Sequence, residues 1–245
     1  MTFQERIEKL NHMIADARRI VFFTGAGIST NSGIPDFRSE DGLYNKTFEE
    51  DPEYYLSDIC LRIEPETFFD YIQTHMDFRG AEPNIAHQKI SELQLARTVS
   101  VITQNIDGLH ALAGSEVVDE IHGSFSRAYC QDCLEDYDGD YIFDAENIPY
   151  CKKCGGIVRP DIVLYGENLA RPHWSNAQLH SGQADLFIVV GSSLTVSPAN
   201  WLPRYFGNNN NLVIINRDTT PLDWEAGLVF HEDITDVFNA IKIPK

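Results

Sequence analysis

Four short apolar runs, spread along the chain, constrain the fold more than any other feature of the sequence. They read RIVFFTGAG from residue 19, TVSVITQN from 98, DLFIVVGSS from 185 and NLVIIN from 211. Each is largely apolar, without the sustained alternation of a strand that has one face in water. Each also ends abruptly in small or polar residues. Runs of this kind are typical of strands that are covered on both faces, as in a parallel sheet.

Helical patterns fill the intervals between these runs. Apolar residues recur at steps of four and three from Phe3 to Ala17, and residues 85–95 and 198–206 are also helical in pattern. Strands that alternate with helices predict a doubly wound α/β fold, in which ligands bind beyond the carboxyl ends of the strands. The polar residues that end the four runs are therefore the place to look for a site.

Two segments depart from this rhythm and predict a second, smaller domain. Residues 39–79 are rich in aromatic residues and have the character of helices and loops, while residues 127–165 hold four of the five cysteines. We expect a helical module over 39–79 and a cysteine-bearing module over 127–165. The larger domain then comprises residues 1–38, 80–126 and 166–245.

The cysteines form two Cys-x-x-Cys pairs, Cys130 with Cys133 and Cys151 with Cys154. Two such pairs with about 15–20 residues between them match a tetrahedral zinc site with four thiolate ligands. The alternative is two disulfides or free thiols, and disulfides are disfavoured in the cytosol. Because four thiolates leave no open position, the predicted zinc is structural. The remaining cysteine, Cys60, is expected to be a buried, inert thiol.

The formal net charge of −18 restricts the partners. A strongly acidic surface repels phosphate backbones, so we do not expect nucleic acid as a direct partner. No apolar run approaches the about 20 residues of a membrane span, and the first residues contain no signal-peptide core. We therefore expect a cytoplasmic protein without membrane contact. The sequence leaves the oligomeric state open, and a monomer is compatible with it.

The first run leads into a glycine-rich turn, TGAGISTNSGIPDFR. Such a turn after a strand can bring N–H groups against a pyrophosphate. Gly25, Gly27 and Gly33 do not keep the G-x-G-x-x-G spacing, however, so an ordinary tight turn remains an alternative. The residues Pro35 to Arg38 favour a flap, with a ring to cover a flat ligand and a charge to meet phosphate or ribose.

The second run continues as TQNIDGLHALAGSEVVDEIHG from Thr103, and polar residues at the end of a buried strand indicate a site. Asp107 is suited to ligand binding, to capping a helix, or to both. Two histidines are candidates for chemistry. His110 lies at the predicted start of a helix, so we expect it to have a supporting or packing role.

Seven motifs then occur in order along the chain. They are GAGISTNSGIPDFR, TQNIDGLH, IHGS, the paired Cys-x-x-Cys motifs, RPDIVLYGE, GSSLTVSPA and INRDTTPLD. Together they resemble the sirtuin family of NAD-dependent protein lysine deacylases, in its bacterial type, over residues 20–238. The resemblance implies a large NAD-binding domain with an inverted Rossmann fold and a small domain made of a helical module and a zinc ribbon. Substrates would lie in the cleft between the two domains.

The resemblance also implies roles for individual residues. His122 matches the catalytic base, with Asn105 and Asp107 completing the catalytic set. The implied NAD contacts are Gly25, Ala26, Gly27, Thr30, Asp36, Phe37, Arg38, Gln104, Asn105, Ile106, Asp107, His122, Gly191, Ser192, Ser193, Asn216, Arg217, Asp218 and Ile234. The implied peptide contacts are Val163, Leu164, Tyr165, Gly166 and Val196. Structural alternatives stay open for Phe37 as a core residue and for Asn216 as a simple strand end.

The implied reaction explains these residue types. An amide oxygen is a weak nucleophile, so it must be held close to the ribose carbon from which nicotinamide leaves. Asp107 can accept from the nicotinamide amide, and His122 then takes a proton from a ribose hydroxyl. The products would be free lysine, nicotinamide and O-acyl-ADP-ribose, and no protein nucleophile is required.

Two departures from the family pattern bear on the substrate. Tyr165 stands where the family usually has Phe, which keeps the ring. No Arg follows Tyr71 at the Tyr-x-x-Arg spacing found in members that prefer succinyl-lysine or malonyl-lysine. A dicarboxylic acyl group would lack its guanidinium partner. We therefore expect neutral acyl groups, acetyl first, with longer fatty acyl chains as further candidates.

Two other functions fit part of the pattern. Mono-ADP-ribosyl transfer to a protein, or NAD hydrolysis alone, would use the same cofactor pocket without a strict need for His122. A non-catalytic NAD sensor would not need Asn105, Asp107 or His122. The presence of all three residues favours deacylation.

Overall fold

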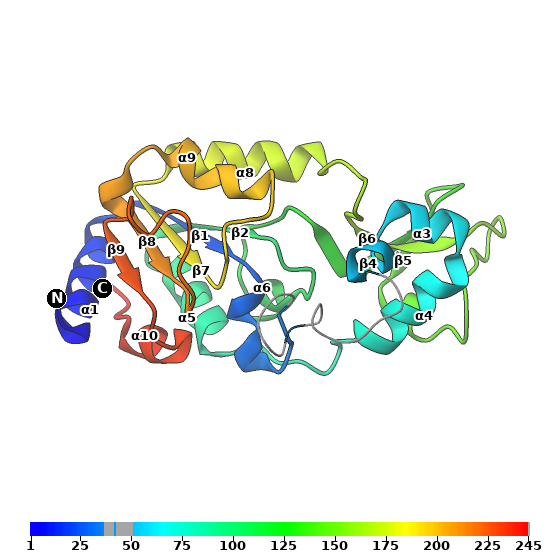
Figure 1. Cartoon of the computed structure of the whole chain (residues 1–245), viewed down its shortest axis with the longest axis horizontal. Helices are drawn as coiled ribbons and strands as arrows, with labels where there is room; N and C mark the ends of the chain where they lie inside the picture. Colours follow the sequence, from blue (N-terminus) through cyan, green and yellow to red (C-terminus); the bar gives the residue numbers. More distant parts are fainter. Residues whose placement is uncertain (37–41, 43–50, 245) are drawn as a thin grey trace.

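A computed structural model describes residues 1–36, 42 and 51–244, so the predicted loop residues Phe37 and Arg38 lie outside the described part of the chain. The larger unit is built on a six-stranded sheet in which every neighbouring pair is parallel (Figure 1). The strand order is β3 (Val118–Glu120), β2 (Thr98–Thr103), β1 (Arg19–Thr24), β7 (Leu186–Val190), β8 (Leu212–Ile215) and β9 (Leu228–Phe230). The four predicted strands are its centre, and the doubly wound α/β fold is confirmed.

Helices cover both faces of this sheet, which explains why its strands are apolar throughout. One face carries α1 (Phe3–Asp16), α5 (Ile85–Gln94) and α10 (Ile234–Ala240), and the other carries α8 (Arg171–Gln183) and α9 (Leu202–Phe206) (Figure 1). In β1, Ile20 and Phe22 join the core under the first group, whereas Val21 and Phe23 join the core under the second. Alternate residues of one strand therefore fill two separate cores.

Local signals fix where the helices begin. Helix α1 starts with a capping box, because Glu5 N–H donates to Thr2 Oγ1 while Thr2 N–H donates to the Glu5 carboxylate. The helical pattern predicted over 198–206 is divided into a 3-10 turn, η4 (Ala199–Trp201), and α9. No helix in the described ranges is both long enough and apolar enough to cross a bilayer.

The smaller unit has an antiparallel sheet of its own, in the order β5 (Asp136–Asp138), β4 (Gly123–Cys130) and β6 (Val158–Ile162). Four helices in the described part of the chain belong to it: α2 (Pro52–Tyr55), α3 (Asp58–Ile63), α4 (Pro65–His75) and α7 (Asp140–Phe143). Phe68 and Ile72 of α4 share one apolar core with Ile142 and Val158 of the cysteine-bearing module. The two segments that broke the α/β rhythm therefore pack together. Strand β4 begins at Gly123, ahead of residue 127, where we expected that module to start.

The order of the sheet shows where a ligand would bind. From β1 the chain moves to β2 and β3 on one side, whereas β7, β8 and β9 lie on the other side. The direction of winding thus reverses between β1 and β7. Ligands of open α/β sheets bind at such a switch point, in the crevice outside the carboxyl ends of the strands.

Candidate functional site

The glycine turns that end β1 and β7 pack against each other at the switch point. Gly25 N–H donates to Val190 O at 3.0 Å, and Gly27 N–H donates to Gly191 O at 2.9 Å. A Cβ on Gly191 would lie 2.3 Å from Ile28 N, and its φ is +61°. Only glycine permits so close an approach of two backbones in this conformation.

Two 3-10 turns, η1 (Ala26–Ile28) and η2 (Thr30–Ser32), follow β1 in place of a long helix. The G-x-G-x-x-G spacing belongs to a turn at which an α-helix begins. Because 3-10 turns follow β1 instead, the glycines of this chain do not keep that spacing. The short turns leave Ala26 and Thr30 facing a cavity.

A serine that the sequence did not single out ties together the polar residues after β2. Asn105 Nδ2 donates to Ser29 Oγ at 3.1 Å, and Ser29 Oγ donates to Asp107 Oδ2 at 2.7 Å. Ser29 is 1% exposed. The sequence feature that could have identified Ser29 as a site residue is its position between two predicted NAD contacts, Ala26 and Thr30.

Asp107 makes a helix-start contact while its carboxyl group also lines a cavity. Its Oδ1 accepts from Leu109 N–H at 2.9 Å, at the beginning of the short helix α6 (Leu109–Leu112). Burial raises the pKa of Asp107, and the hydrogen bonds from Leu109 and Ser29 oppose that shift. The N-cap of α6 is Gly108, so Asp107 accepts from the first turn from one position before the cap, and its carboxyl group also faces the cavity.

His122 lies between β3 of the large sheet and β4 of the small sheet. Its Nδ1 is 2.9 Å from Gln104 O. Because a carbonyl oxygen only accepts, Nδ1 carries the proton and Nε2 keeps a free lone pair. Burial lowers the pKa of His122, and the hydrogen bond to Gln104 opposes that shift. The neutral imidazole with an accepting nitrogen is the form that a general base requires.

His110 is instead part of the packing. It is 2% exposed, with Nε2 3.0 Å from Thr24 Oγ1 and its ring edge-to-face against His87 at 4.8 Å. Burial lowers the pKa of His110, and the neighbouring His87 lowers it further. Burial also lowers the pKa of His87, to about 4. Both rings are therefore neutral near pH 7, which suits a supporting role for His110.

Two cavities meet at His122. The larger, of about 530 Å³, lies between the two units, and the smaller, of about 230 Å³, lies over the carboxyl ends of the large sheet. Their shared lining is Ala26, Gln104, Asn105, His122 and Val196. The remaining predicted residues of the larger cavity are Ile106, Asp107, Val163, Leu164, Tyr165 and Gly166. Those of the smaller cavity are Gly25, Gly27, Thr30, Asp36, Gly191, Ser192, Ser193, Asn216, Arg217, Asp218 and Ile234.

Every predicted NAD or peptide residue that the structure describes thus lines one cavity or both. Sequence reasoning missed another part of the lining, namely Ser29, Ile34, Leu56, Met76, Phe78, Asn168, Leu169 and Trp174 in the larger cavity and Asn31, Glu232 and Asp233 in the smaller. Most of these residues lie outside the quoted motifs. They reach the cavities through tertiary packing, for which the sequence carries no local signal.

Hydrogen bonds organise the far end of the smaller cavity. Asn216 Nδ2 donates to Asp218 O at 2.8 Å, which turns the chain directly after β8. Asn31 Nδ2 donates to Thr235 Oγ1 at 2.7 Å and so joins the loop after β1 to the start of α10. The segment that carries Ile234 is therefore connected to the glycine-rich loop.

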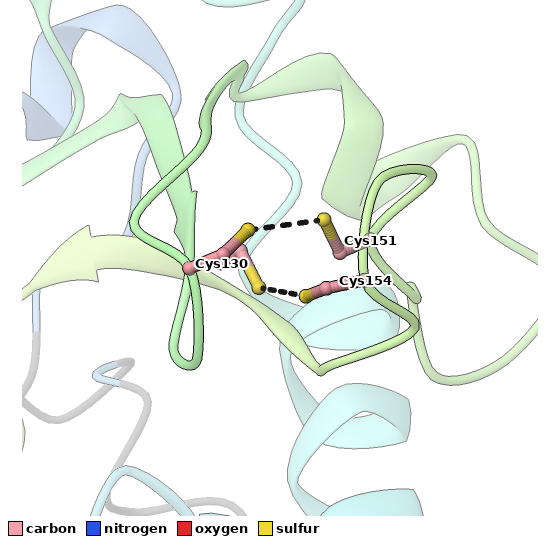
Figure 2. A group of neighbouring side chains, drawn as sticks. Cys130, Cys151 and Cys154 are labelled. Carbon is pink, nitrogen blue, oxygen red and sulfur yellow. Dashed lines mark hydrogen bonds between the residues drawn. The ribbon is translucent and has the colours of Figure 1, made fainter.

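The four predicted zinc ligands converge in the small unit (Figure 2). Their Sγ atoms all lie within 4.8 Å of one another, with Cys130 to Cys154 at 3.5 Å and Cys133 to Cys151 at 3.6 Å. Zn–S bonds of about 2.3 Å in a tetrahedron place the sulfur atoms about 3.8 Å apart. A disulfide requires about 2.05 Å. The donor set therefore fits one tetrahedral zinc ion, and all four cysteines are free of disulfides.

Hydrogen-bond donors face two of the four sulfur atoms, Cys151 Sγ and Cys154 Sγ. Lys153 N–H donates to Cys151 Sγ and Gly156 N–H donates to Cys154 Sγ, each at 3.4 Å, while Tyr137 O–H donates to Cys151 Sγ at 3.2 Å. Such donors spread the negative charge of ligand sulfurs and fix their direction. Cys60 lies apart from this cluster. Burial, and to a smaller extent the charge of Glu64, raises the pKa of Cys60 to about 11. It is buried, as predicted.

Comparisons with known proteins agree with this geometry. A model of the Sir2 family matches residues 25–198, which include the lining of the larger cavity, part of the lining of the smaller one and all four cysteines. The chain belongs to the Sir2 family. An NAD-dependent protein deacetylase of Staphylococcus epidermidis is 45% identical over 238 residues, which cover 96% of each chain. One of Clostridium acetobutylicum is 44% identical over 245 residues, covering 98% of this chain and all of that protein.

Solved Sir2 structures resemble the whole molecule. A Sir2 variant with a deacetylated p53 peptide and 3′-O-acetyl-ADP-ribose superposes with a TM-score of 0.88 at 35% identity, covering 96% of both chains. A Sir2 structure with a p53 peptide and NAD⁺ gives a TM-score of 0.83 at 36% identity, covering 95% of both chains. The Sir2 fold, with its large parallel sheet and its separate cysteine-bearing sheet, is thus shared over nearly the full length.

Proposed function

We propose that the chain is an NAD-dependent protein lysine deacylase, which transfers an acyl group from lysine to ADP-ribose and releases nicotinamide. The observation that carries this proposal is the junction of the two cavities at His122. One cavity offers glycine turns, hydroxyls and strand ends to a dinucleotide, and the other offers an apolar channel to an acyl-lysine. A neutral imidazole stands on their shared wall. The activity named for the relatives supports the same assignment.

The groups that line the smaller cavity suit the parts of NAD. Ser192 and Ser193 would meet the phosphates beside the glycine turns, where the absence of side chains lets a ligand come close to the backbone. The polar residues Asn216 to Asp218 would meet the adenosine ribose, and the backbone at Ile234 would meet adenine. Gln104, Asn105 and Ile106 would surround nicotinamide and its ribose, with Asp107 as acceptor for the nicotinamide amide. Phe37 and Arg38 complete this set on the grounds of sequence alone.

The chemistry divides between NAD and the chain. Bound NAD would supply an activated bond between nicotinamide and ribose, from which the acyl oxygen of the substrate would displace nicotinamide. The chain would hold that oxygen close to the ribose carbon. His122 Nε2 then accepts a proton from a ribose hydroxyl, since its Nδ1 is committed to Gln104 O. With one water consumed, the products are free lysine, nicotinamide and O-acyl-ADP-ribose.

The peptide would add as a strand between residues 163–166 and the segment around Val196. Inward-facing backbone groups of the first segment are already in use. Val163 N–H donates to His122 O at 2.9 Å, Tyr165 N–H donates to Leu56 O at 2.9 Å, and Asp58 N–H donates to Tyr165 O at 3.0 Å. These bonds hold one edge of the segment to the protein, whereas Leu164 on the opposite edge bonds to Glu167 through both its N–H and its C=O.

Neutral acyl groups fit the larger cavity better than dicarboxylic ones. Among its described lining residues there is no Lys or Arg, and the two charged groups, Asp107 and Glu167, are both acidic. We therefore expect acetyl-lysine peptide to be deacylated at least about tenfold faster than the matched succinyl-lysine peptide. The measurement is mass analysis of peptide and nucleotide after incubation with NAD. Faster cleavage of succinyl-lysine would overturn the acyl assignment, and unaltered peptide with free ADP-ribose would indicate NAD hydrolysis instead.

The pH dependence should report on the proposed base. Because burial lowers the pKa of His122, the imidazole stays neutral at pH 7 and protonates only in more acidic solution. We expect kcat/KM to be flat around neutral pH and to fall on the acid side with a midpoint below 6.5, the ordinary histidine value. Steady-state rates between pH 5 and pH 9 would check this. A midpoint above 6.5 would contradict a depressed pKa for the base.

The same reasoning favours deacylation over the two alternatives. ADP-ribosyl transfer and NAD hydrolysis give no reason for a base between two cavities, and a sensor gives no reason for an acyl channel. The net charge of −18 favours cationic protein substrates over nucleic acid. We place the protein in the cytoplasm, away from membranes, and leave its oligomeric state open.

A further inference from the structure

The larger cavity reaches solvent beside one turn of the chain. Among its described lining residues, the exposed ones are 165–168, Ser197 and Pro198. The turn spans residues 164–167, and the N–H of its last residue donates to the C=O of its first at 3.0 Å. A peptide whose acyl-lysine side chain enters the cavity would therefore pass beside this turn.

The carboxylate of Asp58 lies directly against the turn. Asp58 is the first residue of α3, and its N–H donates to Tyr165 O at 3.0 Å, so its backbone is fixed to the turn. A Cβ on Gly166 would lie 2.3 Å from Asp58 Oδ1, and Gly166 has a φ of +96°. Glycine at this position thus gives the turn its conformation and leaves room for the carboxylate beside exposed backbone.

Asp58 has no cationic partner among the residues that the structure describes. No described Lys, Arg or His forms an ion pair with its carboxylate, although Arg62 lies four residues later in the same helix. No described group donates a hydrogen bond to it either. The side chain is half-buried, and an incompletely hydrated anion attracts a cation more strongly than a fully hydrated one does.

The carboxylates nearby differ from Asp58, because they already have partners. Glu167, in the turn, makes a two-point contact with Arg159, with Nη1 2.5 Å from Oε1 and Nη2 3.0 Å from Oε2. Asp161, in β6, pairs with Arg127 at 3.0 Å. The described lining of the larger cavity contains no Lys or Arg. Asp58 is therefore an uncompensated negative charge beside an opening without a cation of its own.

We propose that Asp58 is a specificity-determining residue, which selects peptides that carry Arg or Lys within two positions of the acyl-lysine. This inference rests on the proposed function. Successive residues of an extended peptide are about 3.3 Å apart, so the nearest neighbours of the acyl-lysine emerge at the opening. A cationic side chain there would form the ion pair that the described chain leaves unmade. The net charge of −18 would also attract cationic segments from a distance.

The test is a panel of acetyl-lysine peptides that differ at one flanking position, where each carries Arg, Gln or Glu. At one or more of the four positions within two residues of the acetyl-lysine, we expect kcat/KM to be about threefold higher with Arg than with Gln. Glu should give the lowest value. The difference should lie in KM, since the charge acts on binding and not on the chemical step. It should shrink in about 0.5 M salt, which screens the pair.

Two variants assign the preference to Asp58. Asp58→Asn keeps the shape of the side chain but removes its charge, so the Arg-to-Gln ratio should fall close to one. Asp58→Lys should favour the Glu peptide over the Arg peptide. Each ratio compares two peptides on the same enzyme, so a general loss of activity cancels. If Asp58→Asn fails to fold, as judged by its thermal transition and its zinc content, Asp58→Lys decides the matter alone.

The matched control is Asp70→Asn, which makes the same change in charge at an exposed position of α4, outside the described lining of both cavities. It should keep the wild-type ratio. A wild-type enzyme without the preference for Arg, a folded Asp58 variant that retains it, or an equal loss in Asp70→Asn would each overturn the proposal. Failure of the proposed function is distinguishable, because the wild-type protein would then release the acetyl group from none of the peptides.

Discussion

Replacing His122 by Ala should abolish deacylation while leaving both substrates able to bind. The imidazole is the described group on the shared wall of the two cavities that is neutral and has a free accepting nitrogen. Loss of a positioned general base lowers kcat by about 10²–10⁴-fold. The measurement is the rate of O-acetyl-ADP-ribose formation from acetyl-lysine peptide and NAD, with peptide affinity measured separately.

The control for this substitution is His12→Ala, on the exposed face of α1 and distant from both cavities. It should retain the wild-type rate. If His122→Ala kept full NAD-dependent turnover, the base would be elsewhere, and ADP-ribosyl transfer or NAD hydrolysis would become the better assignment.

Removing the zinc should unfold the small unit and, with it, the peptide site. Cys130 and Cys151 are almost fully buried in the core that also contains Phe68 and Ile72. Zinc bound by four thiolates contributes on the order of 10 kcal/mol to the folding of small zinc domains. We therefore expect Cys151→Ala, or prolonged chelation, to abolish deacylation. Metal analysis should find one zinc per wild-type chain and less than about a tenth of that in the variant.

The matched control is Cys60→Ala, which removes a buried thiol from the same unit but outside the metal cluster. It should keep one zinc and most of the activity, at a cost of about 1–2 kcal/mol in stability. Full activity of a zinc-free protein would show that the ribbon does not support the peptide site. Hydrogen exchange in β4 and β6 would show directly whether those strands lose protection.

Much of the fold was predictable because local physics and global architecture agree in the large unit. Strands buried on both faces must be apolar, so β1, β2, β7 and β8 were visible as runs. The cysteine spacing was equally direct, since only a few geometries satisfy four thiolates. The strand order was not visible in the same way, because parallel neighbours such as β1 and β7 are brought together by the whole chain.

The residues of the candidate site also fall into two groups: those that local sequence predicts and those that only the folded chain brings together. Residues at strand ends, such as Gln104 and Asn105, could be predicted from position and from family resemblance. Ser29 could not be ranked above its neighbours, because its importance lies in two hydrogen bonds that form only after folding. Leu56 and Met76 belong to segments that reach the cavity from another module, and no periodicity in their own sequence indicates it.

The place of His122 between two sheets has a mechanical consequence. Ile121 before it directly follows β3 of the large sheet and donates to Thr103 O. Gly123 after it begins the small sheet, with φ of +79° and no room for a side chain against Asp161 O. The proposed proton acceptor thus lies at the connection between the two units, and its backbone carbonyl also accepts from Val163 N–H, in the segment proposed to receive the peptide. A small molecule that separated the two units would displace both His122 and residues 163–166, without occupying either cavity.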